Sequence, residues 1–212
     1  MEEKDNFIEV YKNTLSDKSC DFVIECFEKY KEYTHVGRVA RGEYLDVKDS
    51  LDLNLLKLGK LLPEFLLDEF KEGLKKSIEK YITKYKLLDD ILEMDMWKEF
   101  AIYPYGILAK KYNKGKGGFH KWHQDWGPKN DHAYRYLVCM YYLNDVEEGG
   151  ETGFYHQYIK VKPTKGSLVI FPAYFTHLHK GHVPISSDKY IINFWLLRGQ
   201  PPPDPNLPFK IK

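Results

Sequence analysis

The chain has 212 residues, a length typical of one domain with a single buried core. Aromatic residues make up 16% of it, which excludes a mainly disordered chain. Lysine and arginine number 32 against 31 acidic residues, so the overall charge indicates neither a nucleic-acid-binding protein nor an acidic tail.

Cysteine content and hydropathy predict the cellular setting. The three cysteines, Cys20, Cys26 and Cys139, are too few for a disulfide framework and form no CxxC pair, which favours a reducing compartment. The N-terminal residues contain no apolar core of signal-peptide length, and no uncharged apolar run is long enough to span a bilayer. We therefore expect a soluble, cytoplasmic protein with no membrane partner.

The first third of the chain is expected to be mainly helical. Apolar and polar residues alternate over positions 7–11, which predicts a short strand. Ser16 is placed to cap a helix that carries apolar residues at helical spacing between Cys20 and Phe27. A second helix is predicted over residues 62–85, because apolar side chains recur there every three or four positions.

After residue 92 the pattern changes to short strands. Residues 100–112 are expected to be extended and to lead into a glycine-bearing loop at 113–118. Four further strands are predicted over residues 136–143, 153–161, 167–171 and 190–197, with turn-forming residues between them. Many short strands after flanking helices predict a mainly β fold, a sandwich or jelly roll braced by the N-terminal helices. The proline-rich end is expected to be extended.

The sequence His123-Gln-Asp125 is the first candidate for chemistry. If it lies on a strand or at its end, both side chains point to the same face. Two histidines and one carboxylate on one octahedral face are the ligand set of non-haem Fe(II) oxygenases. On spacing alone, a solvated histidine beside an acid is the simpler interpretation.

A third ligand has to come from later in the chain. His177 and His179 are both candidates on one face, and His179 lies 54 positions after Asp125. Lys189 follows His179 by ten positions and could pair with a carboxylate in the interior. Taken alone, Lys189 could equally be a surface lysine at the start of a strand. On the residues alone, both histidines stay open as the third ligand.

Residues 103–195 resemble the catalytic domain of the Fe(II)/2-oxoglutarate-dependent dioxygenases, and most closely the prolyl 4-hydroxylase-like branch. The matching segments occur in the family's order. They are Tyr112-Asn113 with its glycine loop, His123-Gln-Asp125, Tyr141-Tyr-Leu-Asn144 followed by Glu148-Gly-Gly-Glu-Thr152, Lys162-Pro-Thr-Lys-Gly166 before Leu168-Val-Ile-Phe171, then His179 and Lys189-Tyr190. The resemblance implies a single dioxygenase domain over residues 1–212. Within it, residues 1–99 form a helical support region, 100–198 a double-stranded β-helix (jelly-roll) catalytic core, and 199–212 a proline-rich tail.

The resemblance also implies roles for individual residues. His123, Asp125 and His179 would bind Fe(II), and Lys189 would bind the distal carboxylate of 2-oxoglutarate. Because a lysine offers a point charge rather than a planar fork, a helping hydroxyl group is physically sensible. The further residues implied at the co-substrate pocket are Tyr112, Tyr142, Thr152, Asn193 and Trp195.

The implied reaction uses Fe(II), 2-oxoglutarate and dioxygen, with ascorbate as a further candidate cofactor, and releases succinate and CO2. A peptidyl proline is the expected substrate. A free amino acid or another small molecule is the alternative, and nucleic acid is not expected because the second arginine of the demethylases is missing. A non-catalytic binding protein and a zinc hydrolase remain different classes of hypothesis. The lysine-, aspartate- and isoleucine-rich usage fits an AT-rich genome such as a bacterial or viral one.

Lysines are concentrated between Lys110 and Lys121, with no acidic residue among them. A solvated rim around the pocket is the simpler interpretation, and steering of an anionic co-substrate or an acidic macromolecule is the functional one. The glycines of this stretch do not indicate a phosphate-binding loop, because the Gly-Lys-Ser/Thr ending is absent.

Overall fold

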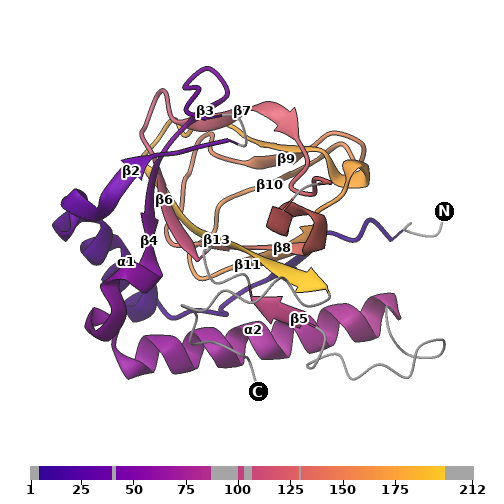
Figure 1. Ribbon diagram of the computed structural model, residues 1–212, viewed down its shortest axis with the longest axis horizontal. Helices are drawn as coiled ribbons and strands as arrows, with labels where there is room; N and C mark the ends of the chain where they lie inside the picture. The colour runs from indigo at the N-terminus through magenta and orange to yellow at the C-terminus, as the bar shows by residue number, and fades with distance from the viewer. Residues whose placement is uncertain (1–4, 40–41, 87–99, 103–106, 129, 199–212) are drawn as a thin grey trace.

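The fold is built on two antiparallel sheets that face each other (Figure 1). The computed structural model describes residues 5–39, 42–86, 100–102, 107–128 and 130–198. The predicted class, mainly β with a jelly-roll core and flanking helices, is confirmed. The expected proline-rich tail at 199–212 lies outside the described residues. Over the part of the chain described, no helix is both long and apolar enough to cross a membrane.

The larger sheet contains eight strands. Its order is β1 (Glu9–Tyr11), β11 (Leu168–Pro172), β8 (Arg135–Tyr142), β13 (Lys189–Arg198), β6 (Leu108–Tyr112), β4 (Leu51–Asn54) and β2 (Thr34–Val36), and β5 (Phe100–Ile102) pairs with the end of β13.

The smaller sheet contains five strands. Its order is β10 (Ile159–Val161), β9 (Thr152–Phe154), β12 (His179–Gly181), β7 (Gly118–His123) and β3 (Lys48–Asp49).

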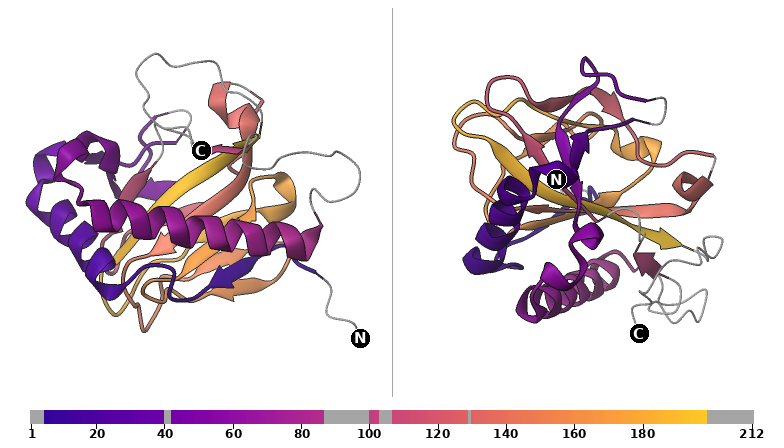
Figure 2. Two further views of the ribbon diagram at one scale, coloured as in Figure 1. Left: turned by 90° about the horizontal axis from the view of Figure 1, so that it is seen from below. Right: turned by 60° about the vertical axis from the view of Figure 1, so that its left-hand side comes forward.

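The helices lie against the outer face of the larger sheet (Figure 2). Helix α1 (Asp17–Lys29) begins where the sequence predicts, because the Ser16 side chain accepts a hydrogen bond from the Ser19 N–H. Helix α2 (Glu64–Tyr85) crosses beneath the sheet over 22 residues. Four short 3₁₀ segments complete the elements: η1 (Lys31–Tyr33), η2 (Leu55–Leu61), η3 (Asn130–Tyr134) and η4 (Phe175–His177).

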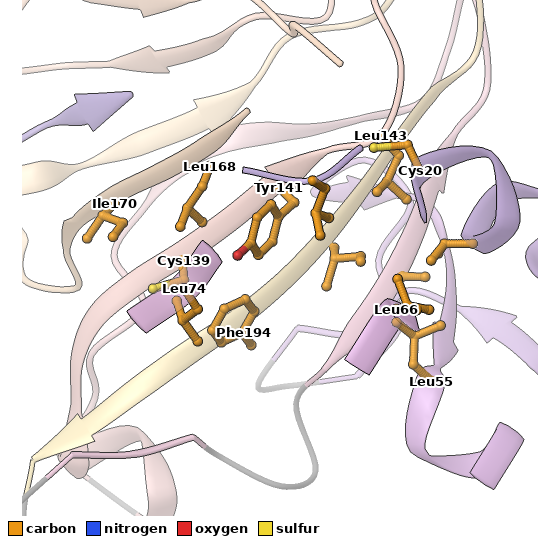
Figure 3. Close-up of a cluster of buried hydrophobic side chains, with 14 of the residues drawn as sticks. Cys20, Leu55, Leu66, Leu74, Cys139, Tyr141, Leu143, Leu168, Ile170 and Phe194 are labelled. Carbon is orange, nitrogen blue, oxygen red and sulfur yellow. The ribbon is translucent and has the colours of Figure 1, made fainter. Parts of the chain in front are cut away.

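Alternation along the central strands divides the buried residues into two cores. On β8, Leu137, Cys139 and Tyr141 belong to the core shared with the helices, which Figure 3 shows in close-up. The alternate residues, Val138 and Met140 among them, belong to the core between the two sheets. Both faces of β8 and β13 are therefore covered, which explains why these strands are nearly continuous apolar runs.

Two strand predictions need correction. The predicted strand over 153–161 is two strands, β9 and β10, separated by a turn at residues 155–158. Tyr158, in that turn, has a φ of 57° and is 92% exposed, so the chain reverses there and β10 pairs back on β9. The stretch at 100–112 contains two separate strands, β5 and β6. Strands β2, β3, β4 and β12 were not expected, because each has only two to four residues.

We expect the contact between α2 and the larger sheet to contribute strongly to stability. Leu74 is 2% exposed and lies among sheet residues that include Cys139 and Phe194 (Figure 3). Leu74→Ala should lower the free energy of unfolding by about 2–5 kcal/mol, because it leaves a cavity. Leu61→Ala is the control, since Leu61 is 52% exposed, and should change it by less than about 0.5 kcal/mol. Urea unfolding measures both, and equal effects would contradict this packing.

Candidate active site

A cavity of about 1190 Å³ opens between the two sheets. Its wall includes residues from β6, β8, β11 and β13 of the larger sheet and from β7, β9 and β12 of the smaller one. Of the residues expected to bind metal or co-substrate, all except Tyr142 line it. The expected site residues that line the cavity lie up to 83 positions apart in the sequence, from Tyr112 to Trp195.

Three of these side chains meet at one point. His179 begins β12 and is the register partner of His123 at the end of β7. The imidazole Nε2 of His179 lies 3.4 Å from Asp125 Oδ2. One ligand atom from each of the three residues lies within 4.8 Å of the other two. Ligands that share one octahedral face are adjacent, with donor atoms roughly 3 Å apart when each lies about 2.0–2.2 Å from the ion, so these three residues would hold a metal ion after a small inward shift.

Asp125 reaches this point from a loop and not from a strand. Strand β7 ends at His123, so strand alternation does not explain why both side chains share a face, as the sequence argument assumed. Instead, the backbone N–H groups of Asp125 and Trp126 both donate to the Ala173 carbonyl, at 3.0 and 2.9 Å. These two bonds fix the turn that directs the carboxylate toward the histidines.

The backbone also sets the tautomer of both histidines. His123 Nδ1 lies 3.1 Å from the Lys121 carbonyl, and His179 Nδ1 lies 3.0 Å from the His177 carbonyl. A carbonyl oxygen only accepts, so in each ring Nδ1 carries the hydrogen. In each ring Nε2 is therefore the nitrogen that is left to bind a metal ion, which is the arrangement that a metal ligand needs.

Charge states in the cluster suit a divalent cation. Burial, reinforced by the neighbouring His179, lowers the pKa of His123 to about 3. Burial alone would raise the pKa of Asp125, but hydrogen bonding and charge from His179 hold it well below its usual value. At neutral pH the cluster therefore offers a neutral imidazole at His123 beside an ionised carboxylate.

His177 does not share this site. Its Nε2 lies 2.9 Å from the Asn6 carbonyl, and its Nδ1 lies 2.9 Å from the Thr176 hydroxyl. The ring packs edge-on against Phe7. Both nitrogens are thus engaged on the side of β1, so the structure brings His179, and not His177, to Asp125.

Lys189 lies deep in the same cavity, and its positive charge is only weakly balanced by nearby negative charge. It is 2% exposed, and its Nζ donates to the Gly150 carbonyl at 2.6 Å. The Nζ also lies 5.6 Å from the Tyr112 ring centre and 5.2 Å from that of Tyr142. Burial, opposed in part by Glu151, lowers its pKa to about 7. An anion placed against this group would offset much of that burial penalty.

A glycine turn presents the carbonyl that Lys189 uses. Gly149 and Gly150 both have positive φ, 74° and 73°, a conformation that glycine adopts without strain. A Cβ on Gly149 would lie 2.4 Å from the Val183 carbonyl oxygen. The turn therefore depends on glycine at this position.

The other expected pocket residues fall into two groups. Tyr112, Thr152, Asn193 and Trp195 line the cavity. Tyr142 lies behind Thr152 and donates its hydroxyl hydrogen to Thr152 Oγ1 at 2.8 Å. Its contribution to the cavity is thus to orient Thr152 and to place its ring beside Lys189.

Four charged cavity residues were missed by the sequence reasoning. Lys48, Asp52, Lys110 and Arg135 all line the cavity and are buried. Lys110 was treated as part of a solvated basic loop, but it belongs to β6 and is 6% exposed. The signal that could have found it is alternation along β6, which gives Lys110 and Tyr112 the same face.

The sequence model of the 2OG-Fe(II) oxygenase superfamily matches residues 107–197. This stretch contains the whole three-residue cluster and Lys189. Over these residues the chain matches the 2OG-Fe(II) oxygenase superfamily. No curated protein matches the chain in sequence.

Solved structures of prolyl hydroxylases share the fold of this chain. The viral collagen prolyl hydroxylase of Paramecium Bursaria Chlorella virus-1 superposes with a TM-score of 0.60 at 22% identity, over 91% of this chain and 96% of that one. A Trichoplax adhaerens prolyl hydroxylase, solved with a hypoxia inducible factor peptide fragment, gives 0.63 at 18% identity, over 91% and 84%. A Pseudomonas putida prolyl-4-hydroxylase gives 0.60 at 16% identity, over 92% and 93%.

The cavity fits the two groups that the matched family is named after, Fe(II) and 2-oxoglutarate. Two imidazoles and a carboxylate suit Fe(II) and leave coordination positions open. The buried Lys189 ammonium, whose only hydrogen bond within the described structure is to a neutral carbonyl, suits the free carboxylate of 2-oxoglutarate.

We expect the buried ammonium of Lys189 to destabilise the metal-free protein at low pH. Its folded pKa of about 7 lies below its ordinary value of 10.5, so between these values the unfolded chain binds more protons and stability rises with pH. Lys189→Met should therefore stabilise the metal-free protein at pH 6 by more than about 1 kcal/mol. The gain should vanish near pH 10.

Urea unfolding of both proteins at the two pH values measures this difference. Lys160→Met replaces an exposed lysine and should show no pH-dependent gain. A Lys189→Met variant that is less stable than the parent at pH 6 and pH 10 alike would contradict the described environment.

Proposed function

We propose that this 2-oxoglutarate-dependent dioxygenase hydroxylates a peptidyl proline and releases succinate and CO2. In this proposal His123, Asp125 and His179 bind Fe(II), and Lys189 binds the distal carboxylate of 2-oxoglutarate. The observation that carries it is the convergence of the three ligand atoms within 4.8 Å, in the cavity that also holds the Lys189 ammonium. A scaffold protein has no need of this combination.

In this proposal the chain's own residues bind the metal ion and the co-substrate, keep the ligands oriented and shield the reaction from water. Fe(II), when bound with 2-oxoglutarate and dioxygen, supplies the oxidation of the substrate C–H bond. The carbonyls of Lys121 and His177 keep both imidazoles oriented with Nε2 toward the metal position. The Lys189 ammonium holds the co-substrate by its far end, and burial strengthens that attraction.

Hydroxyl and aromatic groups complete the proposed pocket. Burial raises the pKa of Tyr112 and of Tyr142 above the usual value, so both hydroxyls stay protonated at neutral pH and act as donors. Tyr142 orients Thr152. Trp195, 7% exposed, gives the cavity an apolar wall that excludes water from the reacting carbon.

A peptide is the favoured substrate for two reasons. Relatives of the same fold are prolyl hydroxylases, and one of them was solved with a peptide. The cavity, about 1190 Å³, also exceeds the roughly 300–1,000 Å³ typical of small-molecule sites. At its mouth Trp122 is 39% exposed, and an aromatic surface of this kind suits a proline ring.

Oxygen insertion into proline peptides is the direct test of function. The purified protein with Fe(II), 2-oxoglutarate and ascorbate should add one oxygen atom to proline in a peptide library, with one succinate formed per hydroxylated residue. Mass spectrometry locates the oxygen, and omission of ascorbate shows whether it is needed. Asp125→Ala should lose at least about 100-fold in rate. Exclusive turnover of free amino acids would overturn the peptide assignment, and full turnover by Asp125→Ala would overturn the metal assignment.

Metal affinity distinguishes the two neighbouring histidines. His179→Ala should weaken binding of Mn(II), used as a redox-stable probe, by at least about 10- to 100-fold, because one ligand is lost. His177→Ala is the matched control, since its ring nitrogens contact Asn6 and Thr176, and should change the affinity less than about threefold. Calorimetric titration of the metal-free proteins measures both, and a reversed order would exchange the roles of the two residues.

A further inference from the structure

A second buried ammonium lies in the cavity, in addition to that of Lys189. Lys110 is 6% exposed, and its Nζ donates to Asn193 Oδ1 at 2.8 Å. Within the described part of the chain, no carboxylate lies within salt-bridge distance of it. Burial, reinforced by the nearby Lys48, lowers its pKa to about 8, so at neutral pH the group is mostly charged.

The carboxylates near Lys110 are already engaged. Asp52 is 2% exposed and accepts hydrogen bonds from Lys48 Nζ at 2.6 Å and from Ser50 Oγ at 2.7 Å. The next carboxylate, Asp125, faces the two histidines. Asp52 is the register partner of Lys110, and its charge offsets part of the burial cost of the ammonium. Among the described residues, however, no carboxylate is hydrogen-bonded to Lys110, which is costly in a buried position.

A hydrogen-bond donor without an acceptor lies beside Lys110. The Lys110 Nζ is 5.9 Å from the centre of the Trp195 ring. The indole N–H of Trp195 is buried and has no acceptor among the described residues. Both groups can only donate, and both line the cavity. This wall thus combines a positive charge with an unsatisfied donor, which is the complement of a carboxylate.

The charge balance of the cavity wall also favours the binding of an anion. The described cavity wall carries four buried cationic side chains and two carboxylates, namely Lys48, Lys110, Arg135 and Lys189 against Asp52 and Asp125. Fe(II) and 2-oxoglutarate carry opposite charges of equal size, so binding both leaves the excess unchanged. In the proposed function the two carboxylates of 2-oxoglutarate are taken by the metal and Lys189. The anion for Lys110 has to come from elsewhere.

We infer that Lys110, held by Asn193 and flanked by Trp195, binds a carboxylate of the substrate, so that the enzyme selects acidic substrates. This inference rests on the proposed function, because it concerns the substrate of that site. The carboxylate can belong to an aspartate or glutamate beside the reacting proline, or to the C1 group of a small amino-acid-like molecule. The chemistry at Lys110 is the same for both sources.

The test compares matched probes that differ in one charge. Three peptides with a single central proline carry Glu, Gln or Lys next to it, on each side in turn. N-acetyl-L-proline and N-acetyl-L-prolinamide form the small-molecule pair. Binding is measured anaerobically by calorimetry to the protein loaded with Mn(II) and 2-oxoglutarate, and hydroxylation is measured in parallel with Fe(II) and air.

The variants separate charge from hydrogen bonding. Lys110→Met removes the charge with little change in length, and Lys110→Gln keeps a donor for Asn193 should the first variant fold poorly. Lys160→Met is the matched control, because Lys160 is exposed on β10 and does not line the cavity. Titration of 2-oxoglutarate into each variant shows whether Lys110 acts on the substrate or on the co-substrate.

We expect the parent protein to bind the Glu peptide, or N-acetyl-L-proline, about 10- to 100-fold more tightly than its neutral partner. Both Lys110 variants should lose this preference and keep their affinity for 2-oxoglutarate within about twofold, while Lys160→Met keeps the preference. The inference is overturned if the parent shows no preference for acidic probes, if the preference survives in Lys110→Met, or if 2-oxoglutarate affinity falls instead.

The same experiment keeps this inference and the proposed function apart. Binding of the Glu peptide that depends on Lys110, without any hydroxylated proline, would support the carboxylate site and refute peptidyl-proline hydroxylation. Equal hydroxylation of the Glu and Gln peptides, together with equal binding of N-acetyl-L-proline and its amide, would support the proposed function and refute the carboxylate site. A preference confined to N-acetyl-L-proline would support the site and assign its carboxylate to a small molecule.

Discussion

The pairing of β12 with β7 places His179 directly opposite His123, and the arrangement of the cavity depends on that register. Because side chains alternate along a strand, a slip of one residue would turn His179 away from the cavity. On its other edge β12 pairs with β9, where His179 is opposite Phe154. A strand of only three residues is thus fixed from both sides.

The larger sheet supplies the rigid support on which this pairing rests. One face of β8 and β13 packs on the helices, as Figure 3 shows for Tyr141 and Phe194, and the other faces the cavity. Such packing gives the sheet a defined position, because cores tolerate little displacement. It also lets the cavity face carry buried cations such as Lys110 and Lys189, whose cost in stability is offset elsewhere in the fold.

Buried charge is the feature that connects stability with function in this molecule. A lysine in a medium of low polarity attracts an anion more strongly than one in water. Lys189 and Lys110 lie on the same sheet face, on neighbouring strands β13 and β6, where Lys110 is the register partner of Ile191. In our account one ammonium selects the co-substrate and the other selects the substrate. Specificity then comes from two buried charges that form no salt bridge with any carboxylate of the described residues.

Most of the fold class was predictable from the sequence, because long elements have clear periodicity. The α2 face and the apolar runs of β8 and β13 are examples. Short strands such as β3 and β12 carry too few residues for a period to be recognised. The ligand cluster was proposed from family resemblance. The loop that directs Asp125 depends on backbone hydrogen bonds to the Ala173 carbonyl, and no local sequence pattern predicts such long-range bonds. Lys110 was misjudged because charged residues are usually exposed.

The most direct measurement of the central claim is the anaerobic visible spectrum of the Fe(II)-loaded protein during titration with 2-oxoglutarate. Chelation of Fe(II) by a keto acid produces an absorption band that neither component shows alone. The account predicts that this band appears at one Fe(II) per chain and requires more 2-oxoglutarate in Lys189→Met. A band of full intensity in a variant that lacks both His123 and His179 side chains would contradict it.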